Sequence, residues 1–204
     1  MKGKVKRRVI AWVLSFALVM GTVLGGPGLF MKAHAADAGV LYIIDSIGGT
    51  PESVTEDCTD SAGGWSYDAG TATLTLDGFQ GEYIEANGDI NIVLKGKNKI
   101  TISAESTEGI KSTGKVTIDD TISPVQDCLD IYCSDGTESV SMIYTGGFGA
   151  DYATYIVGGT VNLVEENTRR RYVTGISRWA YVENDASLNI NLSADGGRNG
   201  AAAL

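Results

Sequence analysis

The residues with the clearest chemical potential lie close together near the end of the chain. Trp179 and Tyr181 alternate in the segment GISRWAYVEN, with Arg178 beside them and Tyr172 shortly before. Aromatic faces suit the CH groups of a sugar ring, and polar side chains nearby suit its hydroxyls. The four residues are therefore predicted to bind a ligand. The alternative, that Trp179 and Tyr181 cover an open end of the hydrophobic core, stays open.

A short basic run precedes this cluster in a chain that is otherwise acidic. Arg169, Arg170 and Arg171 are consecutive, and guanidinium groups bind carboxylates in a bidentate manner. Arg170 therefore joins the predicted ligand-binding residues, with an acidic polysaccharide as the class of ligand. For the run as a whole we favour the alternative, which is ion pairing with Glu165 and Glu166 directly before it.

An acid-rich insertion holds the only aspartates that are placed to converge. Asp127, Asp130 and Asp135 lie within it. Converging carboxylates of this kind serve either acid–base catalysis or the binding of Ca²⁺. The insertion lacks the alternating Asp-x-Asp-x-Asp-Gly loop of calcium sites. No metal is assigned, and these three aspartates remain the candidate Ca²⁺ ligands.

Catalytic residues are not predicted. Glycoside hydrolysis needs two carboxylates that face each other, whereas the pairs Asp119-Asp120 and Glu165-Glu166 would point to opposite faces of a strand. The single histidine, His34, lies in a segment that is expected to be removed. Histidine-dependent nucleophiles and histidine-ligated metals are thereby excluded from the mature protein.

The first 35 residues are typical of a secretory signal peptide. Basic residues at positions 2 to 8 precede an apolar run over residues 9–24, and a small-residue cleavage motif ends at Ala35. The run is shorter than the roughly 20 apolar residues of a membrane span. Cleavage removes six basic and no acidic residues, which changes the formal charge from −9 to −15. A secreted or cell-surface location is predicted, and nucleic acid is disfavoured as a partner.

Three cysteines remain after cleavage: Cys58, Cys128 and Cys133. An odd number leaves at least one thiol unpaired. A bridge between Cys128 and Cys133 requires a turn between them, and Cys58 can reach either only through the fold. The pairing stays open, and we favour three small hydrophobic side chains over a zinc site, whose ligand spacing is absent.

The elements that position these residues repeat along the chain. An apolar residue, a polar stretch usually containing glycine, and apolar residues at alternate positions recur at intervals of 21 to 27 residues. The copies are Ile84–Leu94, Ile110–Ile118, Ile131–Met142, Ile156–Leu163 and Val182–Leu192, with centres at Ile92, Ile118, Met142, Leu163 and Ile190. Such periods indicate stacked solenoid units, because one unit cannot bury its own apolar face. The predicted fold is all-β, a right-handed parallel β-helix or β-solenoid over residues 84–204.

Residues 36–83 are predicted to cap this solenoid within the same domain. A first strand lies in residues 39–50, and a β-hairpin follows over residues 63–78, with Trp65 and Tyr67 turned inward. The polar, acidic stretch between them has no periodicity and is predicted to be a loop.

The sequence also makes predictions for two further surfaces of the solenoid, its outer polar face and its C-terminal end. Residues between the inward positions face outward and form a predicted polar row of Asn91, Thr117, Ser141, Asn162 and Asn189. We favour a solvated Asn and Thr ladder over a binding surface for this row. Residues 194–204 offer no amphipathic helix to cover the last repeat. Either the reading frame is truncated there, or end-to-end self-association or burial by a partner is expected.

The hairpin and repeats carry a resemblance to a known family. The motifs are LYIIDSIGGT, WSYDAGTATLTLDGF and IEANGDINIVLKGKNKIT. In these motifs the chain, from about residue 39 onward, resembles secreted carbohydrate-binding-domain-containing proteins of anaerobic Gram-positive bacteria. The resemblance implies a β-helix and glycan association at the cell surface. The match is weaker at residues 121–139, where extra residues interrupt the repeat pattern, and the resemblance identifies no ligand residues.

These observations give one functional hypothesis and two alternatives. The first is a non-catalytic, secreted or cell-surface β-solenoid that binds a glycan or cell-envelope polysaccharide. The second is a polysaccharide-cleaving β-helix enzyme that uses acidic residues with an arginine or lysine base. The third is a structural stalk or adhesin fragment. No cofactor is predicted beyond the candidate Ca²⁺.

Overall fold

A computed structural model of the chain describes residues 40–104, 106–120, 127–136, 139–165, 172–183 and 185–192. The predicted signal peptide, the arginine run at residues 169–171 and the predicted uncovered end at 194–204 lie outside these residues. Within the described ranges, no helix has the length and apolar character needed to cross a membrane. The described elements are β-strands and one 3₁₀ helix, η1 (Ala150–Tyr152).

The strands form three sheets, which we call sheets A, B and C. Sheet A contains, in spatial order, β16 (Val173–Ile176), β13 (Val140–Thr145), β10 (Glu108–Ser112), β7 (Tyr83–Ala86), β1 (Leu41–Ile44) and β2 (Glu52–Val54). Sheet B contains β17 (Ala180–Val182), β14 (Thr154–Ile156), β11 (Val116–Asp120), β8 (Ile90–Lys95), β5 (Thr73–Asp77), β4 (Trp65–Asp68) and β3 (Cys58–Asp60). Sheet C contains β18 (Ser187–Leu192), β15 (Thr160–Glu165), β12 (Cys128–Cys133), β9 (Lys97–Ile102) and β6 (Gln80–Gly81).

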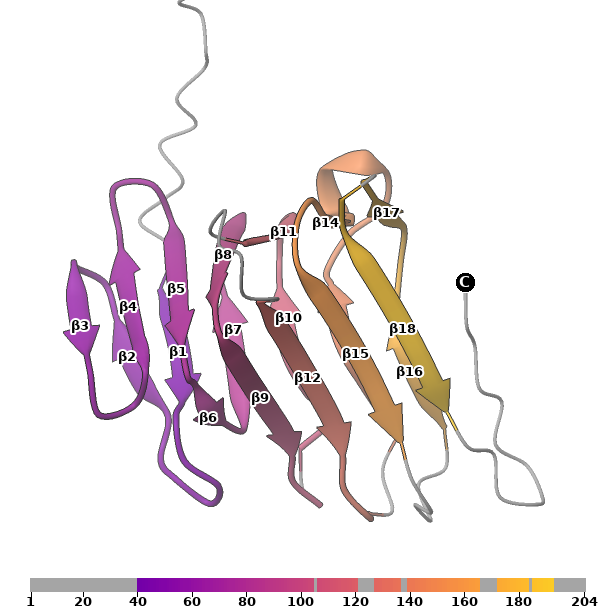
Figure 1. The fold of residues 1–204 in the computed structure, drawn as a ribbon, viewed down its shortest axis with the longest axis horizontal. Helices are drawn as coiled ribbons and strands as arrows, with labels where there is room; N and C mark the ends of the chain where they lie inside the picture. Colours follow the sequence, from indigo (N-terminus) through magenta and orange to yellow (C-terminus); the bar gives the residue numbers. More distant parts are fainter. Residues whose placement is uncertain are drawn as a thin grey trace, which may run out of the picture. The chain divides into compact units, whose positions relative to one another are not determined.

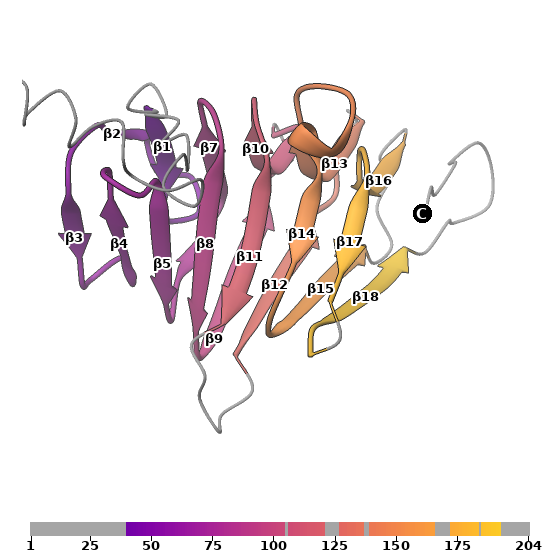
Figure 2. The ribbon, with the colours of Figure 1, turned by 90° about the horizontal axis from the view of Figure 1, so that it is seen from above.

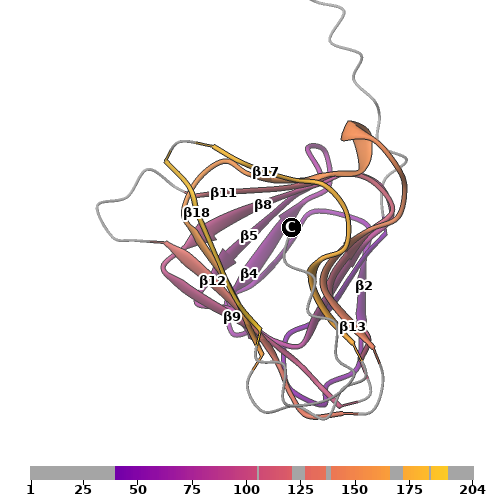
Figure 3. The same ribbon diagram turned by 90° about the vertical axis from the view of Figure 1, so that its right-hand side faces the viewer.

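From β7 onward the chain passes from sheet A to sheet B to sheet C and back, with one strand per sheet in each coil. The coils are β7–β8–β9, β10–β11–β12, β13–β14–β15 and β16–β17–β18. Figures 1 and 2 show strands of successive coils side by side. Figure 3, seen along the axis, shows a three-sided prism that winds in the right-handed sense. The predicted right-handed parallel β-solenoid is confirmed.

The hydrophobic core lies inside this prism as three columns of aliphatic side chains, one per sheet. Residues of neighbouring strands pair directly: Ile84, Ile110, Ile143 and Ile176 in sheet A; Ile92, Ile118 and Ile156 in sheet B; Ile100, Ile131 and Leu163 in sheet C. In the last described coil, Val182 and Ile190 continue two of the columns but are exposed and partly buried, respectively. Each fully buried aliphatic side chain contributes about 1.5–3 kcal/mol relative to exposure. Stacking therefore supplies the burial that one coil lacks.

The predicted class of fold is right, but the predicted assignment of residues to equivalent positions in successive repeats is wrong. The five predicted centres do not form one column: Ile92 and Ile118 belong to sheet B, Met142 to sheet A, and Leu163 and Ile190 to sheet C. Each predicted copy is two strands joined at a corner. Alternation shows which side chains face inward but not which sheet they belong to, so three similar sides were merged into one repeat.

The N-terminal cap is confirmed, with one correction. Strands β4 and β5 form the predicted hairpin, and Trp65 and Tyr67 are turned inward with exposed fractions of 2% and 5%. The stretch predicted as a loop contains β2 and β3, which pair antiparallel with β1 and β4. Edge strands need only backbone hydrogen bonds on one side, so an apolar pattern was not required.

A buried asparagine fixes the corner between sheets B and C. The Asn98 side-chain oxygen accepts the backbone N–H of Phe79 at 2.9 Å, and its amide donates to the Cys128 carbonyl at 3.2 Å. Three successive turns of chain are thereby joined at one point. Gly96, with φ of +65°, makes the preceding turn in a conformation that favours glycine.

Candidate functional site

Two of the predicted ligand-binding residues lie on the outer face of sheet B, at its C-terminal edge. Tyr181 is an outward residue of β17, and Trp179 directly precedes that strand. Their exposed fractions are 42% and 58%. They lie two residues apart on one extended segment, so their side chains share a face.

A second tyrosine from the preceding coil completes this surface. Tyr155 of β14 pairs in register with Tyr181, and the two rings stack with centroids 4.8 Å apart and planes 13° from parallel. The Lys115 ammonium lies 5.8 Å from the Tyr155 ring centroid. Parallel pairing thus holds two aromatic rings in a fixed arrangement on the surface.

Arg178 brings a further aromatic residue to the same corner. Its guanidinium carbon lies 4.5 Å above the ring centroid of Phe148, which is 80% exposed in the loop after β13. This cation–π contact anchors a side chain that otherwise has few packing partners. We call Phe148, Tyr155, Trp179 and Tyr181 the aromatic platform.

The remaining predicted residues do not join this platform. Tyr172 is exposed but precedes β16, whereas Arg178 follows that strand. A strand of this length separates the two by on the order of 13 Å. Arg170 lies outside the described residues. The predicted cluster is therefore divided, with Trp179, Tyr181 and Arg178 together and Tyr172 apart.

Phe148 and Tyr155 were missed by the sequence analysis. Both lie in the coil before Trp179, separated from it by 31 and 24 residues in the chain. The signal that could have found Tyr155 was its outward place between the buried Thr154 and Ile156. A correct alignment of the successive coils would have placed Tyr155 beside Tyr181.

The candidate Ca²⁺ ligands do not converge. Asp127 is buried before β12 and accepts the Gly96 backbone N–H at 2.7 Å. Asp130 lies on the outer face of β12, where the amide of Asn162 donates to it at 2.6 Å, and Asp135 lies beyond the end of that strand. Among the described residues, no group of three or more His, Cys, Asp or Glu side chains is arranged to hold a metal. The aspartates lie apart because the insertion contains the extended strand β12.

The same strand separates two of the cysteines. Cys128 and Cys133 occupy opposite ends of β12, so the turn that a bridge between them would need is absent. Cys133 is buried, Cys128 is half-buried and Cys58 is exposed, and none of the three forms a disulfide. Burial is the main cause that raises the pKa of the Cys128 thiol.

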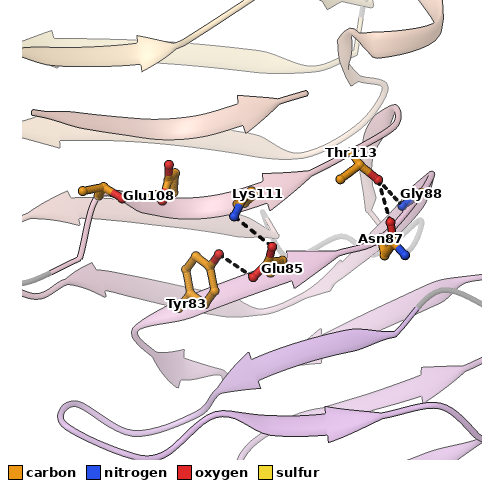
Figure 4. A network of polar contacts seen from close by, with 8 residues as sticks. Tyr83, Glu85, Asn87, Gly88, Glu108, Lys111 and Thr113 are labelled. Carbon is orange, nitrogen blue, oxygen red and sulfur yellow. Dashed lines mark hydrogen bonds and ion pairs between the residues drawn. The ribbon is translucent and has the colours of Figure 1, made fainter. Parts of the chain in front are cut away.

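A charged cluster on sheet A bears on the enzyme alternative. The Lys111 ammonium lies 2.9 Å from one Glu85 carboxylate oxygen, and the Tyr83 hydroxyl donates to the other oxygen at 2.9 Å. Figure 4 shows both contacts. The hydrogen bond to Glu85 raises the pKa of Lys111. Burial opposes ionisation of Glu85, but the bonds from Lys111 and Tyr83 outweigh it and lower its pKa.

These directions are the reverse of what acid–base catalysis needs. A lysine base requires a lowered pKa, and a carboxylic acid that donates a proton requires a raised one. Lys111 and Glu85 are instead stabilised in their charged forms. The cluster is a structural ion pair between β7 and β10.

The predicted polar row is distributed over all three sheets. Asn91 and Thr117 lie on sheet B, Ser141 on sheet A, and Asn162 and Asn189 on sheet C. On sheet C the amide of Asn189 donates to Asn162 at 2.9 Å, which continues the ladder begun by Asp130. Each ladder hydrogen bond connects neighbouring coils, as expected for a solvated sheet face.

The opposite end of sheet B carries an open groove of about 420 Å³. It lies over β3, β4 and β5, and its lining includes the hydroxyls of Ser66, Thr73 and Thr75 and the carboxylates of Asp57 and Asp68. Sugars form hydrogen bonds with such groups, so the groove is polar where the platform is aromatic.

The fold and these surfaces define a β-solenoid with an exposed aromatic platform. Comparison with known proteins gives no match: no family model fits the chain, and no curated protein or solved structure is significantly similar to it.

Proposed function

We propose that this protein is a secreted or cell-surface, non-catalytic β-solenoid module that binds carbohydrate through the aromatic platform. The single observation that carries the proposal is the fixed pair of Tyr155 and Tyr181 beside the exposed Trp179. Large aromatic side chains are normally buried, and a group of them on one surface marks a site of interaction.

The platform has the mixed chemistry that sugar rings require. Tyr181 uses one ring face on Tyr155, and no described strand of sheet B lies beyond it on the other side. The Trp179 ring beside it is 58% exposed and offers a surface to the CH groups of a pyranose ring. Arg178 and Lys115 supply donors for hydroxyl oxygens close to the rings.

The charged cluster on sheet A gives no support to the enzyme alternative. The carboxylate and ammonium of the Glu85 and Lys111 pair are committed to each other, 2.9 Å apart. The signal-peptide features of residues 1–35 and the family resemblance favour work outside the cell, where polysaccharides are accessible ligands.

A glycan array tests the proposal. We expect the protein to bind at least one glycan, and Trp179→Ala to weaken that binding tenfold or more, corresponding to about 1.4 kcal/mol or above. Tyr42→Ala, at an exposed aromatic on sheet A, is the matched control and leaves binding unchanged. Binding to no glycan, or equal loss in both variants, would overturn the proposal.

A further inference from the structure

The outer face of sheet B connects the aromatic platform with the polar groove at the opposite end. Five outward side chains pair in register from strand to strand along it: Tyr181, Tyr155, Thr117, Asn91 and Thr73. We call these five residues the axial row. It begins on the platform and ends in the groove, because Thr73 lines the groove.

The side chains of the axial row have the chemistry of successive sugar subsites. Two aromatic rings are followed by a hydroxyl, an amide and a second hydroxyl. Asn91 is exposed, and its amide donates to the Thr71 carbonyl at 3.2 Å. Each of these side chains can accept from or donate to a sugar hydroxyl.

The spacing of the row determines what shape of ligand it fits. Neighbouring strands lie about 4.8 Å apart, and an extended chain of pyranose rings advances by close to one strand spacing per sugar. A chain parallel to the solenoid axis thus meets one row residue per sugar. A branched or compact glycan does not match a straight row.

The charges beside the row determine what kind of sugar it accepts. Asp57 and Asp68 line the groove, and Asp119 is exposed on β11 next to Thr117. The cations described on this stretch of the face are Lys115 near Tyr155, Lys95 at the end of β8 and Arg178 beside Phe148. Asp77, exposed at the end of β5 and paired in register with Lys95, adds a fourth carboxylate, so acidic groups outnumber basic ones. Uronate carboxylates along the row would meet like charges, which costs free energy.

We propose that the axial row binds a linear, neutral polysaccharide in an extended conformation, parallel to the solenoid axis, with one sugar per strand from β17 to β5. The inference rests on the proposed function, since the platform provides the first subsite. To the proposed function it adds the direction in which the ligand runs, the number of sugars bound and the absence of charge on them. It also departs from the acidic polysaccharide that the arginine run suggested.

Binding by oligosaccharides of increasing length tests this inference. The probes are cello-, manno- and chito-oligosaccharides of two to six sugars and the matching oligogalacturonides, titrated by calorimetry into the purified protein. For one neutral series, affinity is expected to rise up to five sugars and then level off. The Asn91→Ala, Thr117→Ala double variant should weaken binding of the pentamer about tenfold and leave the dimer unchanged.

The control variant is Asn189→Ala, which removes an exposed asparagine of the sheet C ladder and should leave every affinity unchanged. Affinity independent of length, or an unaltered pentamer affinity in the double variant, would overturn the axial row while the platform proposal stands. Preference for oligogalacturonides would overturn the neutral class. If no probe and no array glycan binds, the proposed function fails together with this inference.

Discussion

The two ends of the solenoid use aromatic residues in opposite ways. At the N-terminal end, Trp65 and Tyr67 of sheet B face inward and close the core beneath the hairpin. At the C-terminal end, Trp179 and Tyr181 of the same sheet face outward, and the inward Val182 is 46% exposed. The same residue types thus stabilise the fold at one end and remain accessible at the other.

The difference shows that a cap and a binding surface have separate physical requirements. The cap removes apolar area from water and joins the strand edges of β1 and β5 to antiparallel partners. The platform keeps aromatic area exposed and held in place by one stacking contact and one cation–π contact. Substitutions at the two ends should therefore separate stability from binding.

The largest effect is expected from the two tryptophans. Trp65→Ala should lower the free energy of unfolding by about 3–5 kcal/mol, because it leaves a cavity under the hairpin. Trp179→Ala should change it by less than about 0.5 kcal/mol, as is usual for exposed positions. Urea unfolding followed by circular dichroism measures both. Similar losses in the two variants would mean that Trp179 is a cap residue.

The next largest effect is a difference in the free energy of unfolding between two core substitutions, one in sheet B and one in sheet C. Ile118 is fully buried between two coils, so Ile118→Ala should cost about 2–5 kcal/mol. Ile190 lies in the last described coil and is only partly buried. Ile190→Ala should cost less than half as much in the same unfolding experiment. An equal cost would show that the C-terminal coil is covered in solution.

The next prediction is a pH effect on stability from Glu82, at the N-terminal end. Glu82 accepts the Gly48 N–H at 2.9 Å and the Ser106 hydroxyl at 3.0 Å. Burial opposes its ionisation, but these bonds and one with Ser103 outweigh it and lower its pKa. A lowered pKa means that the contribution to stability is present above the unfolded value, about 4.3, and is lost as pH falls below it.

Glu82→Gln should therefore reduce the fall in stability between about pH 5 and pH 3. The matched control is Glu52→Gln, at an exposed position of β2, and unfolding titrations across this pH range give the comparison. A pH profile of Glu82→Gln that overlays the wild type would contradict the role assigned to this carboxylate.

The smallest effect is expected from chelation. Asp127 lies before β12, Asp130 on it and Asp135 beyond it, and Asp127 already accepts the Gly96 backbone N–H. EDTA should produce no measurable shift in the melting temperature and no change in glycan affinity. A fall in either on chelation, restored by Ca²⁺, would show that a cation site forms in spite of this spread.

The sequence was sufficient for some features of the molecule and not for others. Alternation identified inward residues such as Ile92 and Leu163, and turn chemistry located the hairpin with Trp65. These signals are local, so one sequence contains them. The class of fold followed from them because short strands of alternating pattern at regular intervals need stacked neighbours.

The phase of the coils and the composition of the platform depended on contacts between distant residues. Tyr155 meets Tyr181 only because β14 and β17 pair across 26 residues, whereas other coils need up to 38 between partners such as Ile118 and Ile156. Loops of unequal length determine these intervals, and the alternation of apolar and polar residues within a strand does not predict the loop lengths. The predicted site was therefore correct at Trp179 and Tyr181 but lacked Tyr155 and Phe148.

Acrylamide quenching of tryptophan fluorescence tests the central claim most directly. Trp65 is buried and Trp179 is exposed. The part of the quenching that is lost in the Trp179→Phe variant therefore comes from Trp179, and it reports on the platform alone. We predict that a glycan selected from the array protects this component from acrylamide and shifts its emission to shorter wavelength. Unchanged quenching of Trp179 at saturating glycan would contradict binding at the aromatic platform.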